Sequence, residues 1–225
     1  MTALATVARL IGDPTRAAML DALLGGVALA SGELARITGV GPATASEHLA
    51  RLRDGGLVDV VSQGRHRYYR LASPEVGDAI EALTLLDRSR ADIDSLRAAK
   101  EDAALRLART CYDHLAGRLG VAVHDALVAR GTFAAGYELS GGGAELLGGL
   151  GVDVAAARSA RRQFARGCLD FTQRRPHLAG ALGAALCGRL FELGWLRRRT
   201  ARGRTLRITE DGRTVLATAF GIAEL

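Results

Sequence analysis

The sequence predicts a mainly α-helical protein with small β-ribbons, an α+β fold in three parts. Three observations support this prediction. Residues 31–71 follow the order helix, turn, helix, ribbon; a long stretch with helical spacing comes next; and one sequence pattern occurs twice in the last half. We therefore expect a winged helix-turn-helix domain at 1–75, a long linking helix at 76–109 and a C-terminal domain at 110–225.

Composition is compatible with two small globular domains in a chain of 225 residues. No apolar run reaches the roughly 18 residues of a membrane span, and Gly12-Asp13-Pro14 interrupts the first helix where a signal peptide would need an apolar core. The three cysteines lack the close spacing of a disulfide framework. We expect a cytoplasmic protein.

The first two helices of the 31–71 segment are joined by a tight turn. Ser31 is a good N-cap for the first, which is expected to turn Leu34 and Ile37 inward. Thr38 to Gly41 provides the turn. Pro42 suits the first position of the second helix, where its missing N–H would have no partner in any case.

The second helix has one apolar and one polar face. Ala45, Leu49 and Leu52 recur at i, i+4 and i+7 and should face the core. The opposite face is small and polar, which suits a DNA major groove about 12 Å wide. The residues expected to contact bases are Thr44, Ser46, Glu47 and His48, with Arg51 on a phosphate.

A β-ribbon with a basic tip is predicted next. Residues 57–61 are rich in β-branched side chains, 62–65 have the composition of a turn, and 66–71 return as a second strand. As a wing, the tip would meet phosphates or a minor groove; as a plain hairpin, it would be a solvated turn. The wing residues are Gln63, Arg65, His66 and Arg67.

The segment GELARITGVGPATASEHLARLRDGGLVDVVSQGRHRYYRL resembles the winged-helix domain of the ArsR/SmtB family of bacterial repressors, and IGDPTRAAMLDAL upstream resembles that family's first helix junction. The resemblance implies a homodimer that binds a palindromic operator and releases it when an effector arrives. Metal-sensing members carry cysteines in the helix that reads ELARI here, or acidic–histidine pairs after the wing. Residues 33–37 have no Cys and 75–100 have no His. The effector must therefore be sensed elsewhere.

From Pro74 to Arg109 apolar side chains follow helical spacing, with charges on the other faces. The stripe consists of Val76, Ile80, Leu83, Leu86, Ile93 and Leu96. We interpret this stretch as a dimerisation helix. The alternative is that it packs against the chain's own C-terminal domain.

The C-terminal domain contains an internal repeat. HLAGRLGVAVHDALVARGTF begins at His114 and HLAGALGAALCGRLFELGWL at His177, 63 residues later. Each copy reads as a helix, an extended segment and a helix start, so we predict two degenerate winged-helix-like units at 110–165 and 168–225. The second has the fuller wing, with a cluster of arginines that favours phosphate contact over a solvated loop. These are Arg197, Arg198, Arg199, Arg202, Arg204 and Arg207.

The repeat also contains possible ligands. Each copy has Cys-x-Asp followed by His, and two such units packed about a pseudo-twofold axis would bring them together. The candidate metal ligands are Cys111, His114, Cys168, Asp170 and His177. Cys and His together suit zinc, copper(I), arsenic or haem. The i, i+3 spacing of Cys111 and His114 would place them on one helical face.

Three other interpretations stay open. These residues could be helix caps and core side chains. An organic effector could occupy an apolar pocket lined by Phe164, Phe171, Phe191 and Trp195. Cys111 and Cys168 could form a thiol switch if their Cα atoms lie within about 7 Å. CLDFTQRRPHLAG resembles the tail of extended ArsR-type regulators, which implies no particular ligand.

The sequence contains no Walker A loop, GxSxG, HExxH or other catalytic pattern, so we expect no enzyme. We interpret the chain as a homodimeric, sequence-specific DNA-binding transcriptional regulator. We expect it to be a repressor that is released by an effector sensed in the C-terminal domain, which is a metal, a thiophilic ion, haem or a small organic ligand. The alternatives are an architectural DNA-binding protein without an effector and a redox-responsive regulator.

Overall fold

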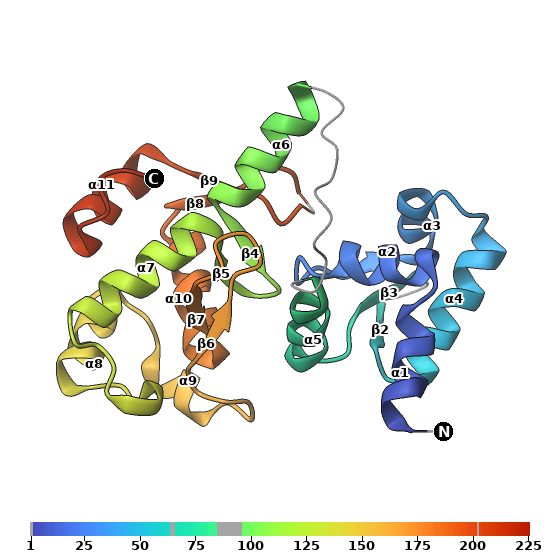
Figure 1. Ribbon diagram of the computed structural model, residues 1–225, viewed down its shortest axis with the longest axis horizontal. Coiled ribbons are helices and arrows are strands. Elements are labelled where there is room, and N and C mark those ends of the chain that lie inside the picture. The colour runs from blue at the N-terminus through green and yellow to red at the C-terminus, as the bar shows by residue number, and fades with distance from the viewer. Residues whose placement is uncertain (1, 64–65, 85–95, 202) are drawn as a thin grey trace. The chain divides into compact units, whose positions relative to one another are not determined.

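The computed structural model describes residues 2–63, 66–84, 96–201 and 203–225. The chain divides into two compact units, Met1–Leu83 and Thr84–Leu225 (Figure 1). Both contain helices with small antiparallel hairpins, which confirms the predicted class of fold. Within the described ranges, none of the helices combines the length and the apolar character needed to cross a bilayer.

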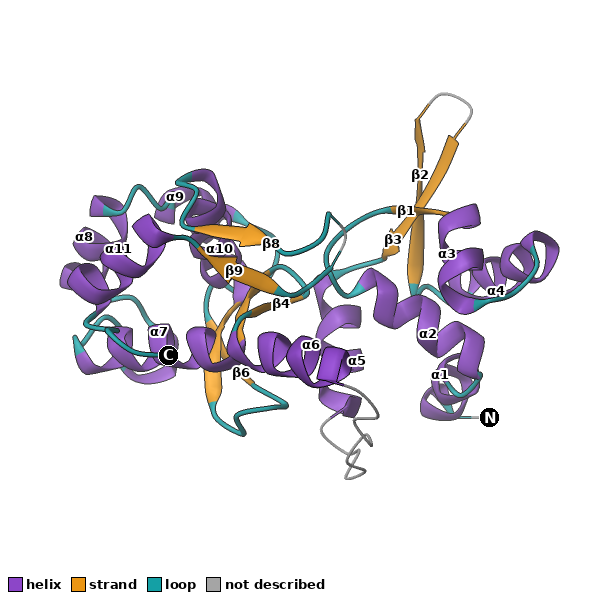
Figure 2. Cartoon of the chain, turned by 90° about the horizontal axis from the view of Figure 1, so that it is seen from above, coloured by secondary structure: helices purple, strands orange, loops and turns teal. Residues whose placement is uncertain are grey.

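The first unit is a helical cluster with a three-stranded antiparallel sheet of order β1-β3-β2. Its elements are α1 (Ala3–Ile11), α2 (Pro14–Leu23), β1 (Leu29–Ala30), α3 (Ser31–Thr38), α4 (Pro42–Asp54), β2 (Val58–Gln63), β3 (His66–Leu71) and α5 (Pro74–Thr84). Strands β2 and β3 form a ribbon that extends away from α3 and α4 (Figure 2). This is the expected order of a winged helix.

Helix α3 begins differently from the prediction. Ala30 occupies the N-cap position, and its N–H donates to the Glu33 carboxylate at 2.8 Å. Ser31 is therefore the first helical residue and not the cap. Leu34 is fully buried as expected, but Ile37 is 55% exposed because the helix turns Ala35 toward the core.

Helix α4 follows its predicted pattern. Ala45, Leu49 and Leu52 are completely buried. Pro42 is the first helical residue. The helix is thus fixed on one face by its apolar side chains, which leaves the polar face outward.

The second unit is built around two hairpins, each followed at once by a helix of 13 residues. Its elements are α6 (Leu96–Leu107), β4 (Arg109–Cys111), β5 (His114–Ala116), α7 (Gly117–Ala129), η1 (Ala135–Tyr137), α8 (Gly141–Gly149), α9 (Val154–Ser159), β6 (Arg166–Leu169), β7 (Pro176–Ala179), α10 (Gly180–Glu192), β8 (Leu196–Arg198), β9 (Leu206–Ile208) and α11 (Glu210–Phe220). Helix α7 packs against β7, and α10 packs against β5. Each helix therefore covers the hairpin of the other half.

Glycine makes the strand-to-helix turns possible. Gly117 and Gly180 begin α7 and α10 with φ of +77° and +83°, a region that L side chains avoid. A Cβ at Gly117 would lie 2.8 Å from the Arg106 carbonyl oxygen, and one at Gly180 would lie 2.8 Å from that of Gln163. The Gly of each HLAG segment is thus required by backbone geometry.

The stretch expected as one helix over 76–109 contains parts of two described helices. Leu86 and Ile93 of the predicted stripe lie outside the described residues. Helix α6 ends at Leu107, and Arg109 already pairs with Ala116 in the β4–β5 hairpin. The helix prediction is wrong at this end because the backbone from Arg109 onward exchanges its hydrogen bonds across strands.

Candidate functional sites

The outward face of α4 is polar and accessible. Thr44, Ser46, Glu47 and Arg51 are exposed. The Ser46 hydroxyl donates back to the Pro42 carbonyl at 2.9 Å, and Arg51 lies 3.9 Å from Glu47 in a loose surface pair. All four therefore lie where a nucleic acid could reach them.

His48 was expected on the same face, and this prediction is wrong. Its side chain is 13% exposed, and its Nδ1 lies 3.5 Å from the Asp13 carboxylate and 3.5 Å from an Arg16 guanidinium nitrogen. Position 48 is three residues after Ala45 and four before Leu52, so it falls at the edge of the buried face. His48 joins α4 to α2.

The predicted wing is described in part. Arg67 on β3 is exposed, and Ser62 pairs with it across the ribbon. Arg65 and the side chains of Gln63 and His66 lie outside the described residues. Their contacts with DNA stay predictions.

The two hairpins of the second unit bring the predicted cysteines and histidines together. Cys111 pairs directly with His114 across β4 and β5, and Cys168 pairs directly with His177 across β6 and β7. Directly opposed residues share one face of a hairpin. Each hairpin therefore presents one thiol and one imidazole side by side, on strands and not on the predicted helical face.

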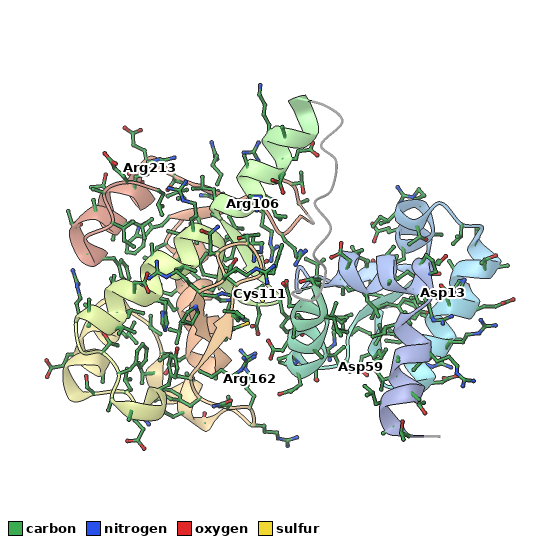
Figure 3. All side chains as sticks on the ribbon, in the orientation of Figure 1. Asp13, Asp59, Arg106, Cys111, Arg162 and Arg213 are labelled. Atoms are coloured by element: carbon green, nitrogen blue, oxygen red, sulfur yellow. The ribbon has the colours of Figure 1, made fainter. Side chains whose placement is uncertain are left out.

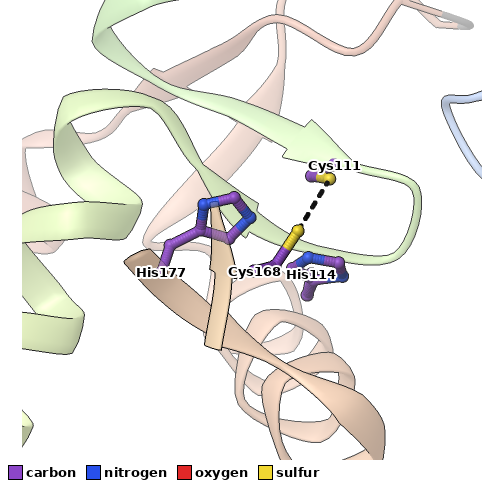
Figure 4. A group of neighbouring side chains, drawn as sticks. All are labelled: Cys111, His114, Cys168 and His177. Carbon is purple, nitrogen blue, oxygen red and sulfur yellow. Dashed lines mark hydrogen bonds between the residues drawn. The ribbon is translucent and has the colours of Figure 1, made fainter. Parts of the chain in front are cut away.

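The four side chains form one compact group (Figure 4). Their ligand atoms all lie within 4.8 Å of one another. The sulfur atoms of Cys111 and Cys168 are 4.0 Å apart, and the rings of His114 and His177 have centroids 5.0 Å apart. Cys111 and both histidines are buried, whereas Cys168 is partly exposed. We call these four residues the Cys2His2 cluster.

A carboxylate lies beside each imidazole. Asp113 Oδ1 is 3.3 Å from His114 Nδ1, and its other oxygen accepts from Arg162 Nη1 at 2.7 Å. Figure 3 labels Arg162 and Cys111 among the side chains of the second unit. Asp170 Oδ2 is 3.5 Å from His177 Nδ1 and accepts from Arg109 Nη2 at 3.0 Å. Both histidines thus direct Nδ1 toward an aspartate that is itself held by an arginine.

Asp170 was predicted as a fifth ligand, but its carboxylate lies outside the group of ligand atoms. One oxygen accepts from Arg109 and from the Gly117 N–H at 2.7 Å, and the other from Thr172 and the Gln173 N–H. These donors fix the position of the carboxylate. Asp170 is a supporting residue beside His177.

Two supporting residues were missed by the sequence analysis, Arg162 and Arg109, whereas Asp113 is the Asp of the first predicted Cys-x-Asp pattern. A signal for Arg109 exists, because the repeat reads Arg-x-Cys-x-Asp at both 109–113 and 166–170. Arg109 is completely buried on the Asp170 carboxylate. Arg162 has no such signal, since it precedes the second copy.

The surroundings shift the acidity of the cluster. Contact with the Cys111 thiol and with both imidazoles outweighs burial and lowers the pKa of Cys168 to about 2. Burial lowers the pKa of His177. Burial acts the same way on His114, but Asp113 and Cys168 together raise the pKa of that ring above its ordinary value. The chemistry is that of a thiolate facing two imidazoles.

The surroundings also keep Asp170 ionised. Burial favours its neutral acid, but the Arg109 guanidinium and the hydrogen bonds from Thr172 and Gly117 hold the pKa of Asp170 well below its usual range. The Arg109–Asp170 pair is therefore a buried ion pair.

The third cysteine and the aromatic residues do not belong to the Cys2His2 cluster. Burial raises the pKa of Cys187 to about 12, so it is a protonated core residue. Phe164, Phe191 and Trp195 pack against the hydrophobic core, and Phe171 lies under the Arg109 guanidinium at 4.0 Å. The predicted organic-ligand pocket stays a prediction.

Residues 11–61, which span α2, α3 and α4, match the family described as a helix-turn-helix domain. Over 213 residues the chain is 40% identical to the uncharacterized HTH-type transcriptional regulator YdfF of Bacillus subtilis, covering 93% of both proteins. The chain belongs to the ArsR family of HTH-type transcriptional regulators. It is a regulator rather than an enzyme, as predicted, and its relationship to YdfF includes the second unit.

Other relatives of this ArsR-family regulator match a smaller share of the chain. It is 40% identical over 82 residues to the HTH-type transcriptional regulator CmtR of Mycobacterium tuberculosis, covering 36% of this chain and 69% of CmtR. HlyU from Vibrio cholerae is a solved structure with 29% identity and a TM-score of 0.35, covering 39% of this chain and 94% of HlyU.

Proposed function

We propose that this protein is a homodimeric, operator-binding repressor in the cytoplasm that is released by an effector bound in the second unit. The observation that carries the proposal is the outward face of α4. Three completely buried apolar residues fix one side of this helix, while small polar residues occupy the other. A ribbon of two strands follows α4 with an exposed arginine.

Residues on this surface have separate roles in the proposal. Thr44, Ser46 and Glu47 lie on the outward face near the helix start, where short side chains let the backbone approach base edges. Arg51 and Arg67 bind phosphates. Gln63, Arg65 and His66 would complete the wing.

The dimer is supported by helix α1. Leu4 is 79% exposed and Val7 40% exposed, three residues apart on one face, and none of the residues of α1 is buried. A second copy of the chain would remove this apolar face from water. The same arrangement repeats the reading helix on a palindromic operator, with half-sites about 34 Å apart.

The experiment is selection of an operator from random duplexes, followed by fluorescence anisotropy at several salt concentrations. Thr44→Ala should flatten the preference for the selected site, because it removes a base contact. Arg67→Ala should weaken binding to every duplex and reduce the salt slope by about 1, because it removes a phosphate contact.

Arg213→Ala is the matched control, an exposed arginine on α11. It should change neither quantity. If Thr44→Ala and Arg67→Ala behave like Arg213→Ala, the assignment of α4 and the ribbon to DNA is wrong.

The β8–β9 hairpin gives a second candidate contact. Arg197 and Arg207 are directly opposed in its register and both are exposed. Like charges at opposed positions destabilise a hairpin, and a phosphate between them would offset the repulsion. In an architectural protein this hairpin would bind DNA without any effector. Arg207→Ala would then weaken binding as much as Arg67→Ala does.

A further inference from the structure

We propose that the Cys2His2 cluster binds one zinc-class divalent ion in a closed tetrahedral site, and that this ion is the effector of the regulator. The ligands are the sulfurs of Cys111 and Cys168 and one ring nitrogen each of His114 and His177. The effector role rests on the proposed function; the metal site itself does not.

The first argument is distance. Zinc–sulfur bonds of about 2.3 Å in a tetrahedron place two sulfurs about 3.8 Å apart. The two sulfurs here are 4.0 Å apart, and all four ligand atoms lie within 4.8 Å of one another. The side chains need only small adjustments to surround one ion.

The second argument is the set of buried nitrogens. Among the described residues, Nε2 of His114 and both ring nitrogens of His177 have no hydrogen-bond partner, although the rings are almost completely buried. Leaving buried polar atoms unpaired costs free energy. An ion between the rings would satisfy the Nε2 atom of each.

The third argument is the orientation of the rings. A histidine ligand usually directs its other nitrogen to a carboxylate, which fixes the tautomer and makes the ligand more basic. Asp113 lies beside Nδ1 of His114 and Asp170 beside Nδ1 of His177, and an arginine holds each carboxylate. Both rings are therefore oriented to coordinate through Nε2.

The donor set selects the class of ligand. Two thiolates and two imidazoles in a tetrahedron are typical of zinc, whereas calcium and magnesium require oxygen. Haem iron takes at most two axial protein ligands, which would leave two members of this group unused. A Cys111–Cys168 disulfide would leave both imidazoles unexplained. Four protein ligands close the coordination sphere, as in a site that binds a metal and performs no reaction on it.

The ion would join the two halves of the second unit. It would link the β4–β5 hairpin to the β6–β7 hairpin, and β4 begins at Arg109, directly after α6 ends at Leu107. Helix α6 is the first described helix that lies wholly within the second unit. Fixing β4 therefore fixes the end of α6, and we propose that the effect of the ion on DNA affinity begins at this helix.

The metal site is tested by titrating metal-free, reduced full-length protein with cobalt(II). We expect one equivalent to bind with the absorption of tetrahedral cobalt and a thiolate charge-transfer band, and zinc to displace it. Cys111→Ser and His177→Gln should each change this spectrum and weaken binding. Cys187→Ser should leave it unchanged, because Cys187 lies in the core. A wild-type protein without a thiolate–cobalt band overturns the site, whether or not the variants fold.

The effector role is tested by measuring operator affinity with and without zinc. We expect zinc to weaken binding about tenfold or more, and Cys111→Ser to bind DNA like the metal-free wild type in both conditions. Cobalt binding without any change in DNA affinity overturns the effector role. If operator affinity changes when Cys111 and Cys168 are oxidised to a disulfide, and does not change with zinc, the effector role of the ion is overturned as well. Failure to bind DNA in either state overturns the proposed function, and the cobalt spectrum still decides the metal site.

Discussion

Asp170 holds three segments of the second unit together. Its carboxylate accepts hydrogen bonds from Arg109 in β4, from the Gly117 N–H at the start of α7, and from Thr172 in the loop before β7. Because both Asp170 and Arg109 have fully buried side chains, each charge depends on the other for its solvation.

Asp170→Asn should therefore destabilise the second unit by about 3–5 kcal/mol, the cost of leaving a buried arginine unpaired. Trp195, the only tryptophan in the chain, lies in this unit, so its fluorescence during urea unfolding of the full-length protein measures the effect. Asp102→Asn is the control, since its partner Arg106 is half exposed on α6, and it should cost no more than about 0.5 kcal/mol. Equal effects of the two variants would contradict this account.

His124 makes the stability of the second unit depend on pH. It lies buried on α7, with Nε2 hydrogen-bonded to the Tyr137 hydroxyl at 2.8 Å, and burial lowers its pKa. The unfolded chain takes up the proton more readily, so the contribution of His124 is complete above about pH 6.5 and is lost as the pH falls toward the folded pKa.

Replacing His124 with Gln keeps a hydrogen-bonding side chain and removes the titration. The unfolding free energy of the wild type should therefore fall more steeply between pH 8 and pH 5.5 than that of His124→Gln. Urea unfolding followed by Trp195 at several pH values measures both slopes. Parallel slopes would show that His124 does not titrate differently in the folded and unfolded chain.

Periodicity predicted single residues well where one helix face meets one core. Ala45, Leu49 and Leu52 lie where their spacing placed them. His48 does not face outward. Helical spacing predicts the direction of a side chain from its own helix but not which other element packs there, and here the start of α2 brings Asp13 and Arg16 to the edge of α4. Asp170 was named from the repeat, but its role depends on the partners that the fold brings to it.

At the scale of elements, the repeat predicted the four residues of the Cys2His2 cluster but not their secondary structure. A spacing of three residues places Cys111 and His114 on one helical face, and it also places them opposite each other across a hairpin with a two-residue turn. The backbone conformation decides between a helix and a hairpin. Gly117, with φ of +77°, starts the helix after His114 and not before Cys111. Convergence of the pairs requires the reciprocal packing of α7 and α10, which no local pattern encodes.

That packing requires glycine within each helix. A Cβ at Gly183 would lie 2.5 Å from the Leu178 carbonyl oxygen and 3.4 Å from the His114 Cβ. Gly183→Ala should destabilise the second unit by about 1–3 kcal/mol, because α10 must move away from the hairpins. The same displacement should weaken cobalt binding. Urea unfolding and cobalt titration measure the two effects.

Gly188 on the same helix is the matched control. Nothing lies within 4 Å of a Cβ built there, so Gly188→Ala should stabilise α10 by up to about 1 kcal/mol through helix propensity. If the two alanines have effects of the same sign, close packing at Gly183 is not what the helix needs.

At the scale of the whole molecule, the proposed function depends on two units with separate chemistry. The first contains the surface proposed for DNA, and the second contains the Cys2His2 cluster. The sequence analysis predicted three parts, at 1–75, 76–109 and 110–225, and the helix predicted over 76–109 ends early at Leu107 and includes residues outside the described ranges. Long amphipathic spacing indicates a helical stretch, but it does not show where strand pairing takes over.

The association of two chains is best tested on α1. The exposed Leu4 and Val7 lie one turn apart, and burying both against a second copy would favour the dimer by the transfer of apolar surface from water. A double substitution, Leu4→Glu with Val7→Glu, places two charges at that interface. Sedimentation should change from twice the chain mass of 23.6 kDa to a single mass. Operator affinity should fall as well, because a monomer binds only one half-site.

Thr6→Glu is the control. It lies on the other side of α1, adds charge without touching the apolar face and should leave a dimer. If the double variant remains dimeric, the interface lies elsewhere and the exposed face of α1 needs another explanation.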